Sequence, residues 1–167
     1  SKVYGDPDGV LSYSITTGTL ATFGGVSDVL NGALSRASGN QVGVNYAINQ
    51  GTLTSTQNTN YNISYVGADF VVTPRPISVT APSINKVYDG GFTYELSSSD
   101  LALMSRQLVG SDTFSAATAI FFGSNPNVGN ARAITIDPAS IVINDGNLGN
   151  NYTVSVVNST GNITPAP

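Results

Sequence analysis

Hydrophobic and polar residues alternate over short stretches along most of the chain, which is the pattern of half-buried β-strands. The alternation is clearest at Leu11–Thr16, Val42–Ile48 and Phe92–Leu96. Further strands are predicted at Ala33–Arg36, Tyr61–Tyr65, Phe70–Val72, Ile77–Ala81, Thr118–Phe122, Ala131–Ile136, Ile141–Ile143, Tyr152–Val157 and Asn162–Thr164. Turn-forming residues separate these stretches, so the pattern predicts a mainly β fold of the sandwich-like or β-grasp-like kind.

Helical signals are few. Asp100–Leu108 carries apolar residues at helical spacing, with Ser99 or Asp100 as the expected N-cap. In the first half, Ser27 and Asp28 suggest a cap for one helical turn, while Gly18–Gly25 is expected to be irregular. The chain therefore holds at most one short helix in each half.

An internal repeat organises the chain. The motif Lys2–Asp6 returns as Lys86–Gly90, and each copy later closes on a tyrosine-led strand and a hydrophobic-Thr-Pro tripeptide, at Val72–Pro74 and at Ile163–Pro165. Such a repeat predicts two tandem modules, residues 1–75 and 76–167. The second motif is preceded by a predicted strand at 77–81, whereas nothing precedes Lys2, so either a strand was cut from the first module or that module tolerates its absence.

The composition of the chain argues against several classes of function. The chain has no His and no Cys, which removes the usual general base, the common nucleophile systems and the commonest zinc ligands, so no catalytic residue and no enzyme activity are predicted. The net charge of -4 and the lack of a basic cluster argue against nucleic acid and against an anionic membrane surface as partners. No apolar run is long enough to cross a bilayer. The abrupt start and the end at Pro165–Pro167 suggest a piece of a longer polypeptide.

Three aspartates are the only candidates for a metal. Asp6 and Asp8 flank a proline in a Gly-Asp-Pro-Asp-Gly stretch, and Asp145 lies in a Gly- and Asn-rich loop. Their oxygens suit calcium, but calcium needs six or more oxygen ligands and few carboxylates are near, so turn formation is the main interpretation. No cofactor and no catalytic or cofactor-binding residue is predicted.

Lysines and tyrosines raise two further hypotheses. Lys2 and Lys86 are the only lysines and hold equivalent positions, so each could form an isopeptide crosslink to an Asn or Asp with an acid nearby, or could simply be solvated beside a packed tyrosine. Tyrosines with Asn/Thr-rich loops could stack on sugars, although most tyrosines fall at inward strand positions and are expected in the core.

The repeated motifs resemble two related modules of large bacterial surface proteins. The first half is similar to the MBG module of YGX type, through Tyr4–Asp6, Leu11–Tyr13, Leu30–Arg36, Val42-Gly43, Tyr46–Ile48 and Gly51–Leu53. The second half is similar to the YDG module, through Lys86–Gly90, Asp112, Val128-Gly129 and Asn151-Tyr152.

The resemblance implies an extracellular or cell-surface location in filamentous-haemagglutinin-like adhesins. It implies a stalk or spacer that projects a binding region during cell adhesion or biofilm formation, with neighbouring repeats of the same polypeptide as its partners. The alternative is a module that binds polysaccharide or a host glycoprotein through its loops.

Overall fold

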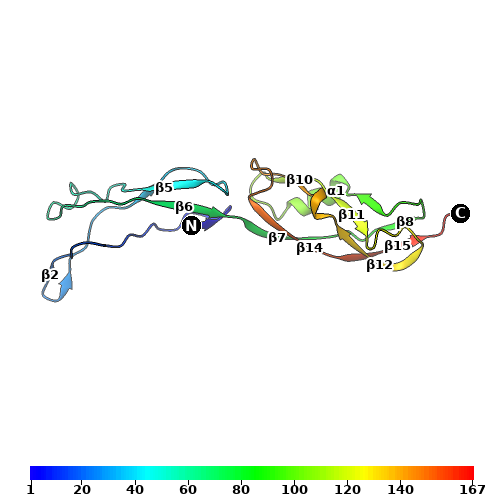
Figure 1. Cartoon of the computed structure of the whole chain (residues 1–167), viewed down its shortest axis with the longest axis horizontal. Helices are drawn as coiled ribbons and strands as arrows, with labels where there is room; N and C mark the ends of the chain where they lie inside the picture. Colours follow the sequence, from blue (N-terminus) through cyan, green and yellow to red (C-terminus); the bar gives the residue numbers. More distant parts are fainter. The chain divides into compact units, whose positions relative to one another are not determined.

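The computed structural model describes all residues from Ser1 to Pro167, and the chain divides into two compact units, Ser1–Thr73 and Pro74–Pro167 (Figure 1). Strands dominate both units, which confirms the predicted mainly β fold in two tandem small domains. No helix in the structure combines the length and the apolar character needed to cross a membrane.

The first unit is built on a four-stranded sheet with the order β1-β6-β5-β4. Its strands are β1 (Lys2–Val3), β4 (Ser35–Arg36), β5 (Asn45–Asn49) and β6 (Ala68–Thr73). β1 runs parallel to β6, while the contacts of β5 with β6 and with β4 are antiparallel. Tyr46, Phe70 and Val72 form the buried core, and Leu11 and Tyr4 pack against it.

A small hairpin lies where an irregular stretch was expected. β2 (Thr22–Phe23) pairs with β3 (Val26–Ser27) across Gly24 and Gly25. Both glycines have positive φ, 60° and 82°, which a two-residue hairpin turn of the primed type requires. The predicted helical turn at Ser27 and Asp28 is wrong, because Ser27 completes this hairpin.

Two predicted strands of the first unit do not form. Leu11–Thr16 has no paired neighbour, and only Leu11 contacts the core, while Tyr13 and Ile15 are 47% and 45% exposed. Tyr61–Tyr65 also lacks a ladder partner. Alternation of polarity sets which side chains face inward, but a strand also needs a neighbour to take its backbone hydrogen bonds.

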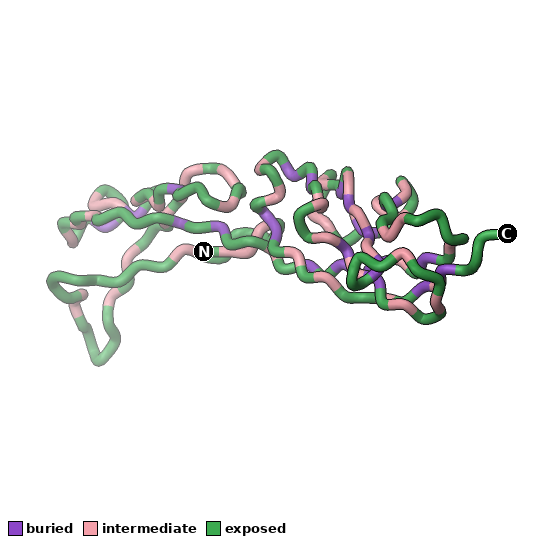
Figure 2. Tube along the Cα trace, turned by 45° about the vertical axis from the view of Figure 1, so that its right-hand side comes forward, coloured by how far each residue is buried: buried purple, intermediate pink, exposed green.

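The second unit has a five-stranded sheet with the order β8-β15-β12-β11-β9. Its strands are β8 (Asn85–Val87), β9 (Thr93–Glu95), β11 (Thr118–Phe121), β12 (Gly129–Ile136) and β15 (Ser159–Thr164). Two further pairs complete the unit: β7 (Arg75–Thr80) with β14 (Tyr152–Val157), and β10 (Thr113–Ala116) with β13 (Val142–Asn144). Phe121, Ile134, Ile136 and Ile163 are almost completely buried. Figure 2 shows short buried segments that alternate with exposed ones along the Cα trace.

The predicted helix is present but starts earlier. α1 spans Ser98–Ser105, and its N-cap is Ser97. The Ser97 hydroxyl accepts from the Asp100 amide, and the Asp100 carboxylate accepts from the Ser97 amide. This reciprocal capping box fixes the helix start two residues before the expected position. A short 3-10 turn, η1 (Pro138–Ser140), is capped by Asp137.

Candidate functional site: the terminal strand pair

The first and last segments of the second unit run side by side in parallel (Figure 1). Residues 75–80 pair with 152–157, and residues 85–87 pair with 162–164, with a constant separation of 77 positions. Between these ladders, the Ala81 amide donates to the Val157 carbonyl at 2.9 Å. We call this arrangement the terminal strand pair of the second unit.

Between the β7–β14 ladder and the β8–β15 ladder, two side-chain hydrogen bonds join the strands, and one glycine allows their backbones to approach closely. The Ser159 hydroxyl donates to the Pro82 carbonyl at 2.8 Å, and the Ser83 hydroxyl donates to the Thr160 carbonyl at 2.7 Å. A Cβ on Gly161 would lie 1.9 Å from the Ile84 carbonyl oxygen. Only glycine permits this approach of the two backbones, so the sequence is fitted to this register.

The first unit repeats the final part of the pair. Lys2 and Val3 lie beside Val72 and Thr73, as Lys86 and Val87 lie beside Ile163 and Thr164. The amide that follows each of the strands β1 and β8 also has an equivalent partner. Tyr4 donates to the Thr73 carbonyl at 2.9 Å, and Tyr88 donates to the Thr164 carbonyl at 2.8 Å. The repeated motif and the hydrophobic-Thr-Pro tripeptide are therefore the two strands that meet when each unit closes.

A tyrosine–aspartate pair recurs in both units. The Tyr61 hydroxyl donates to Asp28 at 2.9 Å, and the Tyr152 hydroxyl donates to Asp112 at 2.5 Å. Each hydroxyl also accepts a backbone amide, from Ala21 at 3.0 Å and Val109 at 2.8 Å. Sequence reasoning did not predict this contact, although the matching Ser-Asp dipeptides at 27–28 and 111–112 marked both acids as equivalent.

Asp8 is held between two cations. Lys2 lies 2.7 Å from one carboxylate oxygen and Arg36 lies 2.5 Å from the other, and both cationic side chains are about nine-tenths buried whereas Asp8 is 43% exposed. The Arg36 guanidinium, with Lys2 beside it, holds the pKa of the Asp8 carboxyl well below its usual range. Arg36 also stacks 4.6 Å from the Phe70 ring centroid, so the ion pair rests on the core of the first unit.

The second lysine makes a smaller ion pair. Lys86 lies 2.6 Å from Asp89 and donates to the Gly91 carbonyl at 2.9 Å. Lys86, together with the Gly91 amide, lowers the pKa of the Asp89 carboxyl. Each lysine therefore lies in an ion pair with an aspartate of its own unit, and the isopeptide crosslink at Lys2 or Lys86 remains a hypothesis.

The other calcium candidates lie in turns. Asp145 is buried, and its carboxylate accepts from the amides of Asn147, Gly149 and Asn151 at 2.8, 2.8 and 3.1 Å. The Asp6 amide donates to the Val3 carbonyl, which closes the turn after β1. Asp6 and Asp8 belong to the first unit and Asp145 to the second, and no cluster of three or more acidic side chains is present. Calcium binding at these residues remains a hypothesis.

The eight tyrosines fall into three groups by exposure, of which Tyr4, Tyr61 and Tyr65 are half-buried. Tyr46 and Tyr152 are buried, as the core interpretation expects, while Tyr13, Tyr88 and Tyr94 are exposed. A groove of about 980 Å³ in the second unit is lined by Asn144, Gly146, Asn150 and other residues of the 141–154 region, including buried Tyr152. No exposed tyrosine lines this groove, so the aromatic platform that stacks on sugars is absent from it.

The fold and the repeated strand pair define a class of tandem β modules. A family model described as "MBG domain (YGX type)" matches residues 1–71, and one described as "YDG domain" matches residues 73–160. The chain belongs to the YDG domain family, and its YDG domain follows an MBG domain of the YGX type, which confirms the predicted resemblance. Domains of both families are found in surface adhesin-like proteins. The searches of characterised proteins and of solved structures each found no match.

Proposed function

We propose that this chain is a structural spacer of a bacterial surface adhesin, located outside the cell, that carries tension between neighbouring repeats. The observation that carries the proposal is the terminal strand pair. The chain enters the second unit at the start of β7 and leaves it at the end of β15, so entry and exit lie at opposite ends of parallel strands. A pull on the two ends then loads the evenly spaced hydrogen bonds of the ladder together rather than one after another.

The link between the two units supports the same role. β6 ends at Thr73 and β7 begins at Arg75, so Pro74 alone separates the last strand of one unit from the first strand of the next. Proline fixes its own φ, and it restricts the residue before it to extended conformations. A one-residue link of this kind suits serial modules whose partners are neighbouring repeats. The proposal assigns no catalysis and no cofactor to the chain.

Small-angle scattering of one, two and three tandem copies of the chain tests the spacer role. A spacer predicts a maximum dimension that rises in proportion to the number of copies. A particle whose maximum dimension hardly changes as copies are added would contradict the proposal.

A second function rests on the groove of the second unit. Asn144 and Asn150 offer amides to a carbohydrate or a host glycoprotein from a surface bounded by apolar residues such as Ile141 and Leu148. We rank this function second because the tyrosine of the groove is buried. Binding of the chain to a panel of polysaccharides tests this second function. Binding that is abolished by Asn150→Asp and preserved in the control Asn40→Asp would favour the second function over the spacer role.

A further inference from the structure

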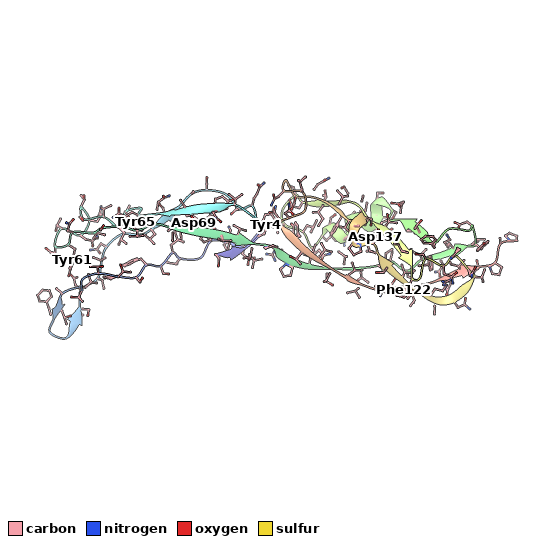
Figure 3. The ribbon with its side chains drawn as sticks, viewed as in Figure 1. Tyr4, Tyr61, Tyr65, Asp69, Phe122 and Asp137 are labelled. Carbon is pink, nitrogen blue, oxygen red and sulfur yellow. The ribbon has the colours of Figure 1, made fainter.

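The two units differ at one edge. In the second unit β14 is paired along its whole length with β7. Val72 and Ile163 are equivalent, because they pair with the equivalent lysines Lys2 and Lys86. Tyr61 precedes Val72 by the same number of residues as Tyr152 precedes Ile163, so Tyr61–Val66 is the segment of the first unit that corresponds to β14. This segment leads directly into β6 and has no paired neighbour (Figures 1 and 3).

The segment already has the side-chain arrangement of a strand. Tyr61, Ile63 and Tyr65 are half-buried, whereas Asn62, Ser64 and Val66 are exposed, and Val66 is 87% exposed. In β14 the same alternation holds, with the tyrosine and two valines at 152, 154 and 156 inward and the residues between them outward. One face of Tyr61–Val66 is therefore fixed against its own unit, as β14 is against the second unit.

The backbone of the segment is open. Only two of its amides have partners: Tyr61 donates to the Asn58 carbonyl at 2.9 Å, and Ile63 donates to the Ser55 hydroxyl at 2.7 Å. The other amides, from Asn62 and from Ser64 to Val66, make no bond within the chain. An extended segment with unpaired amides and carbonyls is a template for one more strand.

We propose that Tyr61–Val66 accepts an added parallel β-strand of the β7 kind, supplied from outside the first unit. The chemistry of the donor follows from β7 itself, where Ile77 and Val79 are buried against β14 and Ala81, directly after β7, is also buried. The donor is thus an extended segment with aliphatic residues at alternate positions, bound through its main chain. This inference goes beyond the spacer role and does not depend on it.

The natural position of the donor follows from the repeat. β7 reaches β14 because it stands just before the Lys86 motif, joined to it by residues 81–84. A donor joined in the same way to Ser1 would reach Tyr61–Val66 in the same register, since Lys2 corresponds to Lys86 in the parallel pairs. The strand pair of the first unit would then have the length that it has in the second.

The test adds a copy of residues 74–84 in front of Ser1 of the full chain, and measures hydrogen exchange of the amides from Asn62 to Val66. Strand addition should slow exchange of the alternate amides that join the ladder by about tenfold or more, because they would open only with the strand. The matched control carries Ile77→Asp and Val79→Asp in the added copy only, and it should exchange like the unextended chain.

A second arm keeps the test decisive if the extension disturbs folding. A synthetic peptide of residues 74–84 is titrated onto the unmodified chain while amide chemical shifts are followed. Saturable shifts centred on Tyr61–Val66, absent with the double-aspartate peptide, would support the proposal. Equal exchange in the extended chain and its control, together with no saturable shift from the peptide, would overturn it.

Discussion

The hydroxyl of Tyr152 donates a 2.5 Å hydrogen bond to Asp112, forty residues earlier, and accepts the amide of Val109 at 2.8 Å. Tyr61 repeats the arrangement with Asp28 in the first unit. In the second unit the tyrosine is the first residue of the closing strand β14. The pair therefore fixes the beginning of the last segment of each unit to a loop near the middle of that unit.

Tyr152→Phe should destabilise the second unit by about 1–3 kcal/mol, because a part-buried amide and a carboxylate lose their shared partner. For a domain of this size that loss lowers the melting temperature by about 4–8 °C per kcal/mol. Calorimetry of the full chain measures the effect on each unit's transition. Tyr61→Phe is the matched control and should lower only the melting temperature of the first unit. If Tyr152→Phe lowered only the melting temperature of the first unit, the role given to the Tyr152–Asp112 contact would be contradicted.

Gly161→Ala should destabilise the second unit by about 3 kcal/mol, because the new Cβ meets the Ile84 carbonyl oxygen at 1.9 Å and the backbones must separate. Urea denaturation measures the loss. Gly91→Ala serves as the control in the same unit, since its Cβ would meet mainly the movable side chains of Asp89 and Lys86. Equal stability of Gly161→Ala and the parent chain would show that residues 84 and 161 do not approach in solution.

Acid should weaken the first unit through Asp8. The pKa of the Asp8 carboxyl is lowered by Arg36 and Lys2, so the folded state binds its proton less readily than the unfolded chain, where the pKa is about 3.9. The contribution of the Asp8 ion pair to the free energy of unfolding is complete at a pH above the unfolded pKa. It is lost as the pH falls toward the lower pKa of Asp8 in the folded state. Urea titrations of the first unit between pH 7 and pH 2 should show this loss.

Asp8→Asn isolates the contribution of this carboxylate. The variant should be less stable than the parent at pH 7, and the difference between the two chains should shrink as the pH falls below about 4. The first unit has three other aspartates, so the comparison of the two chains carries the result rather than either curve alone. A difference that stays constant across this pH range would rule out the Asp8 ion pair as its source.

Calcium should leave the melting temperature of both units unchanged. The Asp8 oxygens are bound by Lys2 and Arg36, and the Asp145 carboxylate is bound by three backbone amides, so neither site offers the six or more oxygens that calcium takes. The measurement is calorimetry in millimolar calcium and then in chelator. A stabilisation that rises with the logarithm of calcium concentration would instead demonstrate a site.

Local signals in the sequence predicted much of this fold. The repeated Lys-Val-Tyr motif and the tripeptides at 72–74 and 163–165 correctly indicated two modules that begin and end alike. The helix near Asp100 was also found, with its start displaced by the capping box at Ser97. The double glycine at 24–25 is a hairpin signal that was overlooked.

Long-range pairing could not be predicted in the same way. Tyr61–Tyr65 and Tyr152–Val157 have the same alternation, yet only the second forms a strand, because β7 lies beside it. The partner of a strand in a parallel pair stands far away in sequence, and periodicity carries no information about it. The Tyr152–Asp112 contact escaped prediction for the same reason.

In the function that we propose, the second unit resists tension through shear of its terminal strand pair, and forced unfolding of single molecules measures this resistance. The chain has no cysteine, so handles can be attached at Pro74→Cys with Pro167→Cys, or at Pro74→Cys with Asn150→Cys. The first pair of handles pulls β7 and β15 from opposite ends, while the second pulls β7 and β14 apart from the same end. Shear of the strand pair predicts a clearly higher unfolding force for the first pair of handles, and equal forces for the two pairs of handles would contradict the spacer role.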